Sequence, residues 1–155
     1  MKKEIWLVVI LAIIIIILIG ILIFIPAKKN PQTKINGIEI ISPKPNENVS
    51  APLIKITGVV NGNGWAGFEG QVGTVKLLDS DGKELATGIL SATTDWTKLP
   101  TNFETTLYLP SNKPQLGTNM PQLGTLIFHN ENPSGLPEKD KTFTLPIGIS
   151  VPVGI

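Results

Sequence analysis

The residues that could carry chemistry in this chain are few and far apart. It has one histidine, His129, and no cysteine, and a lone histidine does not anchor a zinc site. The G-x-S-x-G pattern of a serine nucleophile and the G-x-x-x-x-G-K phosphate loop are both missing. The acidic residues that a glycosidase would pair are scattered along the chain as Glu69, Asp95, Glu104 and Glu131. We therefore predict that the chain is not an enzyme, and we expect no metal, no cofactor and a surface position for His129.

Aromatic residues in glycine- and threonine-rich segments form the first candidate site. Trp65, Phe68 and Trp96 lie in such segments, and Glu69 follows Phe68. If exposed, they would make a binding surface, because aromatic rings give a large contact area at a low entropy cost. If buried, they would plug the ends of the fold. The buried interpretation is favoured for Phe68 and Trp96, whereas both stay open for Trp65. Glu69 is expected to accept hydrogen bonds from backbone N–H groups of its loop, or else to contact a ligand.

A proline-bracketed segment, residues 132–138, forms the second candidate site. It contains Asn132, Ser134, Gly135 and Leu136, and residues of these types form turns in which side chains bond the backbone. The segment is interpreted first as a rigid connection between strands. Because loops at the ends of a β-sandwich commonly carry recognition, a binding role is kept as the alternative.

The charge distribution argues against nucleic acid as a partner. From residue 30 onward, nine lysines face eleven acidic residues, so this part carries a formal charge of about −2. Binding to nucleic acid depends on neutralising phosphates with a basic face. The chain also has no arginine, the side chain best suited to bidentate phosphate contacts.

An apolar run at Ile5–Ile25 predicts one transmembrane helix. As a helix it would be about 32 Å long, close to the hydrocarbon thickness of a bilayer. The run is too long for a cleaved signal peptide and has no A-x-A site after it, and it lacks the motifs of a pilin stalk. We expect an uncleaved signal anchor, with residues 1–4 as a cytoplasmic head and residues 26–36 as a linker. The flanking lysines are nearly balanced, and the large C-terminal part is expected outside the membrane.

The remainder of the chain has the pattern of short strands. Apolar residues recur with period two and are interrupted by Gly and Pro, which predicts an all-β domain over residues 37–153, with a β-sandwich of about seven strands. The last strand is expected at an edge of the sheet, because Pro146 cannot donate to a ladder. A tight turn is expected at residues 79–82 in preference to a calcium loop, and a long loop at the repeat of residues 114–118 and 121–125. The expected strands are residues 38–42, 53–60, 73–78, 84–90, 102–109, 125–130 and 142–151.

The order of motifs in this region resembles a known family. The chain is similar to the immunoglobulin-like domain of bacterial spore germination proteins over residues 38–153. The resemblance implies an immunoglobulin-like sandwich outside the bacterial membrane, with no catalytic role. The motifs that carry it are Ile41-Ser42-Pro43, Trp65-Ala66-Gly67-Phe68-Glu69, Leu77-Leu78-Asp79-Ser80-Asp81-Gly82-Lys83, Asp95-Trp96, Gly124-Thr125-Leu126 and Asn132-Pro133-Ser134-Gly135-Leu136-Pro137-Glu138.

These observations favour a non-catalytic binding module of the bacterial cell envelope. It would be held at the cell membrane by one helix, with its domain outside the cytoplasm, and would bind a protein or a cell-wall component. The alternative is a module that binds carbohydrate or peptidoglycan, in which Trp65 and Trp96 stack on sugar rings.

Overall fold

The computed structural model describes residue 6, residues 33–109 and residues 121–150. The chain divides into two compact units, Met1–Asn30 and Pro31–Ile155, and the second is described here by itself. The predicted helix at Ile5–Ile25 lies, except for Trp6, outside the described residues. Among the residues that the structure does describe, none of the helices combines the length and the apolar character that crossing a membrane requires.

The described residues of the second unit form nine strands and one short 3₁₀ helix, η1. All seven predicted strands are present, with shifts of a few residues at their ends. The prediction of about seven strands missed β1 and β3, and β1 lies inside the predicted linker. Both are too short to show a periodic pattern, and they form only because β2 and β9 bond them. The elements are β1 Lys34–Ile35, β2 Ile38–Ser42, β3 Asn48–Ser50, β4 Leu53–Val60, β5 Gln71–Leu78, β6 Glu84–Ala92, β7 Thr101–Tyr108, β8 Gln122–Asn130, η1 Pro137–Lys139 and β9 Thr142–Ser150.

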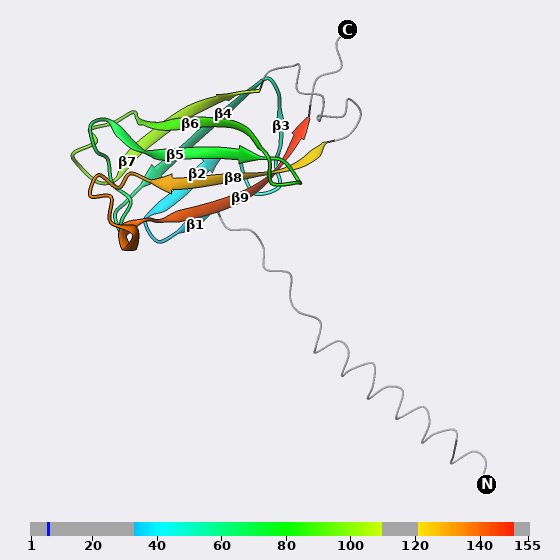
Figure 1. Cartoon of the computed structure of the whole chain (residues 1–155), viewed down its shortest axis with the longest axis horizontal. Coiled ribbons are helices and arrows are strands. Elements are labelled where there is room, and N and C mark those ends of the chain that lie inside the picture. Colours follow the sequence, from blue (N-terminus) through cyan, green and yellow to red (C-terminus); the bar gives the residue numbers. More distant parts are fainter. Residues whose placement is uncertain (1–5, 7–32, 110–120, 151–155) are drawn as a thin grey trace. The chain divides into compact units, whose positions relative to one another are not determined.

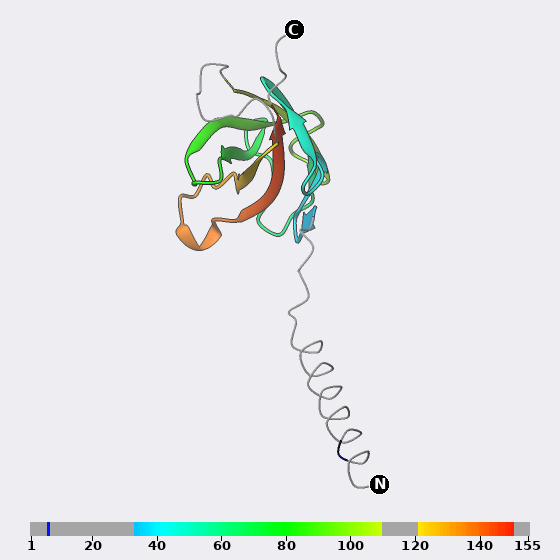
Figure 2. The ribbon, with the colours of Figure 1, turned by 90° about the vertical axis from the view of Figure 1, so that its right-hand side faces the viewer.

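The strands form one hydrogen-bonded sheet in the order β1-β2-β4-β7-β6-β5-β8-β9-β3. Strands β6 and β7 share only two residue pairs, Ser91 with Glu104 and Ala92 with Phe103, and the sheet folds over at this join. The result is a half-barrel in which β1-β2-β4-β7 faces β6-β5-β8-β9 (Figures 1 and 2). The two facing halves are the layers of the predicted sandwich.

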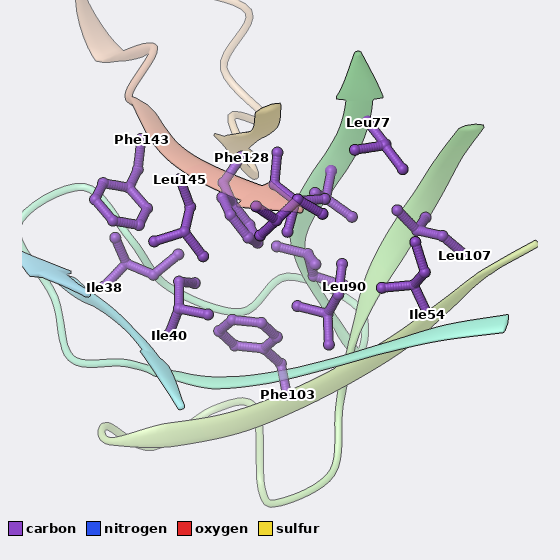
Figure 3. Packing of buried hydrophobic residues seen from close by; sticks show 14 of the residues in the cluster. Ile38, Ile40, Ile54, Leu77, Leu90, Phe103, Leu107, Phe128, Phe143 and Leu145 are labelled. Atoms are coloured by element: carbon purple, nitrogen blue, oxygen red, sulfur yellow. The ribbon is translucent and has the colours of Figure 1, made fainter. Parts of the chain in front are cut away.

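Alternating apolar residues of the two layers meet in a single core. On β4, Ile54 and Ile56 are buried while Lys55 is exposed, as the period of two predicts. Figure 3 shows Ile38, Ile40 and Phe103 of one layer pointing toward Phe128, Phe143 and Leu145 of the other. The rings of Phe128 and Phe143 lie 5.8 Å apart, within the usual range for an aromatic pair. Burial of these side chains, at about 1.5–3 kcal/mol for each large apolar one, is the main stabilising contribution.

The tight turn between β5 and β6 is confirmed. The carboxylate of Asp79 accepts hydrogen bonds from the backbone N–H groups of Asp81 and Lys83, both at 2.9 Å. Gly82 adopts a φ of +79°, which glycine reaches at little cost. The first copy of the short repeat, residues 114–118, lies outside the described residues. Residues 122–125 of the second copy already belong to β8, so the loop expected there is wrong for the second copy.

The expected edge position of the last strand is only partly right. In β9 the end of the strand, residues 148–150, pairs in parallel with β3. Residues 142–146 pair with β8 on one side, and within the described chain no second strand lies against them. Pro146 lies just before the part of β9 that pairs with β3 as well as with β8, so its missing N–H group interrupts neither ladder.

Candidate binding surface at the loop end

All the predicted site residues are found at one end of the half-barrel. Three loops meet there: residues 61–70 between β4 and β5, 93–100 between β6 and β7, and 131–141 between β8 and β9 (Figure 1, left). We call these three loops together the loop end. The strands place them side by side, because Val60 is paired with Thr101 and Gly73 with Asn130.

Two tight turns shape the first loop. Gly62 and Trp65 exchange two backbone hydrogen bonds of 3.0 Å around Asn63 and Gly64, whose φ angles are +53° and +88°. Phe68 and Gln71 exchange two backbone hydrogen bonds of 2.7 and 3.0 Å around Glu69 and Gly70, whose φ angles are +49° and +84°. Positive φ at both central positions defines a type I′ turn. The Asn63-Gly64 pair in the first of them is the strongest sequence signal for this turn.

Trp65 is a core residue, and a binding role for its indole is therefore wrong. Only 1% of its surface is exposed, because the first turn folds the ring back over Gly37. A Cβ atom at Gly37 would lie 2.8 Å from Cδ1 of this indole. The alternative carbohydrate site loses one of its two stacking platforms. The packing partner comes from the β1–β2 turn, which is distant in sequence.

Phe68 and Trp96 remain on the surface, so the favoured plugging interpretation is wrong for both. They are 41% and 38% exposed, respectively. Gly67 brings their loops together, because a Cβ there would lie 2.8 Å from Cβ and from the carbonyl oxygen of Trp96. Leu99 of the same loop as Trp96 is 49% exposed and lies against Gly62. We call Phe68, Trp96 and Leu99 the apolar ridge.

The backbone beside Trp96 is fixed by Asp95. Its carboxylate accepts hydrogen bonds from the hydroxyl of Thr97 at 2.6 Å and from the N–H of Thr97 at 3.0 Å, and it pairs with Lys98 at 3.0 Å. The Thr97 hydroxyl, the Lys98 ammonium and the Thr97 N–H together hold the pKa of Asp95 below its usual value of 3.8. Trp96 is therefore presented by a preformed turn.

Glu69 does not organise its loop as expected. Its side chain is exposed, and no hydrogen bond of its carboxylate is found among the residues that the structure describes. The order of the loop comes from the Phe68–Gln71 backbone pair and from Gly70, whose carbonyl accepts the N–H of Ala92 at 2.8 Å. Glu69 is left as an acidic group beside the apolar ridge.

The third loop is cross-linked by its own polar side chains. Asn132 donates to the carbonyl of Leu136 at 2.9 Å and to Asp140 at 2.6 Å, and Ser134 donates to Asn132 at 2.6 Å. Gly135 turns the chain with a φ of +64°. Leu136 is 44% exposed. The segment connects β8 and β9, its own hydrogen bonds brace it, and one large apolar side chain is displayed on it.

Asn130, which the sequence analysis overlooked, joins two of the loops. Its amide nitrogen donates to the carbonyls of Gly64 at 2.7 Å and Lys139 at 3.1 Å, and its amide oxygen accepts the N–H of Lys141 at 2.8 Å. Gln71 and Glu131 add a side-chain bond of 2.5 Å. The only available signal was an asparagine at the predicted end of a strand, a common place for side chains that bond the backbone.

A shallow hollow of about 280 Å³ lies beside Asn130. In the part of the chain that the structure describes, no three His, Asp or Glu side chains gather so that they could hold a metal ion. His129 is half-buried on the outer side of β8, where its neighbours across the strands are Thr74 and Thr142. The hollow is lined by Gly64, Asn130, Glu131, Asn132, Pro133, Ser134, Glu138, Lys139 and Lys141.

The fold defines the class of protein. Strands β2, β4 and β7 face β5, β8 and β9, which is the arrangement of an immunoglobulin-like domain. Residues 37–119 match the family described as the immunoglobulin-like domain of bacterial spore germination. This match spans more than half of the chain, so the protein belongs to that family. The loop at residues 132–138, which contributed to the resemblance in sequence, lies outside the matched residues. No curated protein matches the chain.

Proposed function

We propose that this protein is a non-catalytic binding module of the bacterial cell envelope, with Ile5–Ile25 as its membrane anchor and its immunoglobulin-like domain outside the cytoplasm. The loop end binds a protein partner through the apolar ridge. The observation that carries this proposal is the exposure of Phe68 and Trp96 on two braced loops that meet at Gly67.

The physical case for this surface is preorganisation. Trp and other large apolar side chains dominate binding energies at interfaces, and they contribute most when ordering them costs little entropy. The Asp95 turn and the two type I′ turns already fix the backbone on both sides of the ridge. The near-neutral charge of this part of the chain favours a protein surface over a polyanion.

Cross-linking of the full-length chain in native membranes tests the partner. A Phe68→Ser/Trp96→Ser variant should recover its partner at least about tenfold less well than the wild type, since each truncation removes an anchor worth roughly 1–2 kcal/mol. The matched control is Leu53→Ser/Tyr108→Ser. These two side chains are paired across β4 and β7 and are 61% and 60% exposed. Equal recovery by all three proteins would remove the ridge from the proposal.

The anchor is tested separately. The full chain should stay in the membrane pellet after alkaline carbonate extraction, whereas a chain that begins at residue 31 should not. Protease added outside spheroplasts should degrade the domain without lysis. Release of the full chain by carbonate would refute the anchor, and protection of the domain would refute its orientation.

The carbohydrate alternative is not proposed further. It depended on Trp65 and Trp96 as two exposed platforms, and Trp65 is buried. A single exposed indole is compatible with a protein contact and needs no sugar ring.

A further inference from the structure

The open part of β9 has unused backbone hydrogen-bonding groups. In β9 the odd-numbered residues bond β8, as the bond from the N–H of Asn130 to the carbonyl of Lys141 shows. Even-numbered residues therefore turn their N–H and C=O groups to the other edge. There Pro146 accepts from Asn46 at 2.7 Å and Gly148 donates to Glu47 at 2.9 Å. By the same alternation, Thr142 and Thr144 present two N–H and two C=O groups that, within the described chain, have no partner.

The strand that carries these four groups has an exposed outer face. The side chains of Thr142 and Thr144 are exposed, while Phe143 and Leu145 between and beside them point into the core. Lys141 does not cover the edge, because its aliphatic stem lies 3.1 Å from the Cβ position of Gly64 in the β4–β5 loop. The edge therefore lacks the lysine cover by which many proteins protect an exposed strand.

We infer that the β9 edge pairs with the same edge of a second copy of this chain, in an antiparallel register centred on Phe143. Thr142 of each copy then lies opposite Thr144 of the other, and the pair exchanges N–H···O bonds in both directions. Four hydrogen bonds form across a two-fold axis, and the β6-β5-β8-β9 layers of the two copies become one continuous sheet. This inference does not depend on the proposed anchor or partner.

The flanking residues select both the occupant and the register. Centring the axis on Thr142 would oppose Thr144 to Asp140, whose N–H already donates to Pro137 at 3.1 Å. Centring it on Thr144 would oppose Thr142 to Pro146, which has no N–H and whose carbonyl is already used. Only the register centred on Phe143 uses all four open groups. The edge is thus complementary to itself, which is the requirement for an isologous dimer.

The side chains also fit this register. Lys141 lies opposite Leu145 and Asp140 opposite Pro146, so no like charges face each other across the junction. Thr142 and Thr144 form two cross-strand threonine pairs on the outer face, a favourable combination in sheets. On the inner face the two Phe143 side chains meet beside their Phe128 partners.

Disulfide formation between single-cysteine variants tests the register. The chain has no cysteine of its own, so each engineered thiol is unique. Residues opposite in a hydrogen-bonded pair have Cα atoms about 5.5 Å apart, within the range that a disulfide spans. Full-length Thr142→Cys and Thr144→Cys, mixed in detergent micelles under mild oxidation, should cross-link at least about tenfold faster than either mixed with Thr106→Cys. Thr106 is an exposed threonine of β7, in the opposite layer.

Three outcomes would overturn the inference. The first is a mixed rate no higher than that of the Thr106→Cys control. The second is faster linking of Thr142→Cys to itself or of Thr144→Cys to itself, since either would mean another register. The third is rapid linking that persists when Thr144→Cys also carries Phe143→Pro, because proline there cannot keep the strand bonded to β8. Mass spectrometry of the linked peptides identifies the joined residues.

Discussion

Replacing Trp65 should destabilise the domain far more than replacing Trp96. Trp65 is 1% exposed and packs on Gly37, whereas Trp96 is 38% exposed on a loop. Trp65→Ala removes a fully buried ring and leaves a cavity, at a cost of roughly 3–5 kcal/mol. Trp96→Ala removes a ring that water already reaches, and its cost should be about 2 kcal/mol or less. Trp65→Phe keeps part of the packing and should fall between the two.

Urea unfolding of residues 31–155, the unit that contains the whole core, measures these differences. A total stability of about 5–15 kcal/mol makes the loss at Trp65 a large fraction of the whole. The fluorescence of Trp65 in the folded domain should also be shielded from a soluble quencher, while that of Trp96 should not. A Trp65→Ala domain as stable as Trp96→Ala would refute the reasoning, because it would mean that the indole is not packed in the core.

Three further predictions concern the loop end. Asn130→Ala removes one hydrogen bond to the β4–β5 loop and two to the β8–β9 loop. It should lower the free energy of unfolding in urea by about 2–3 kcal/mol, and a loss under about 0.5 kcal/mol would contradict the bracing role. Gly73→Ala should lower the free energy of unfolding more than Gly70→Ala does. Both glycines have a positive φ, but only at Gly73 would a Cβ meet the backbone, at the carbonyl of His129. Equal losses of stability in urea unfolding would contradict this prediction. Because the pKa of Asp95 is lowered in the folded domain, its ionised carboxylate stabilises the turn at pH values above the usual pKa of 3.8. This contribution is lost as the pH falls through the pKa of the folded domain. NMR shifts of residues 95–98 should therefore titrate below about pH 4, and Asp95→Asn should abolish this change.

Several features could be predicted from the chain because their causes are local. The alternation in Leu53–Val60 and Thr142–Ser150 set which side chains face the core, and the structure follows it. The Asp79 turn needed only its own five residues. Strands β1 and β3 could not be found in this way, because two or three residues carry no period and their bonds come from distant partners.

The candidate site was predicted less well than the fold. Residue types and glycine-rich surroundings located the right loops, but they could not say which ring faces inward. Trp65 lies in the more glycine-rich segment and is buried, whereas Phe68 three residues later is exposed. Which of the two rings faces inward depends on the type I′ turn at residues 62–65, which reverses the chain directly before Trp65.

The sequence by itself determined that the domain is all-β, which faces of its strands are apolar, and which segments connect them, because the period of two and the turn residues act over a few positions. Only the tertiary structure decided that Gly37 receives the indole of Trp65, that Asn130 ties the loop end together, and that Thr142 and Thr144 keep an open edge. These features depend on strands brought side by side from distant parts of the chain, and hydrogen bonds and packing across such distances leave no pattern in neighbouring residues.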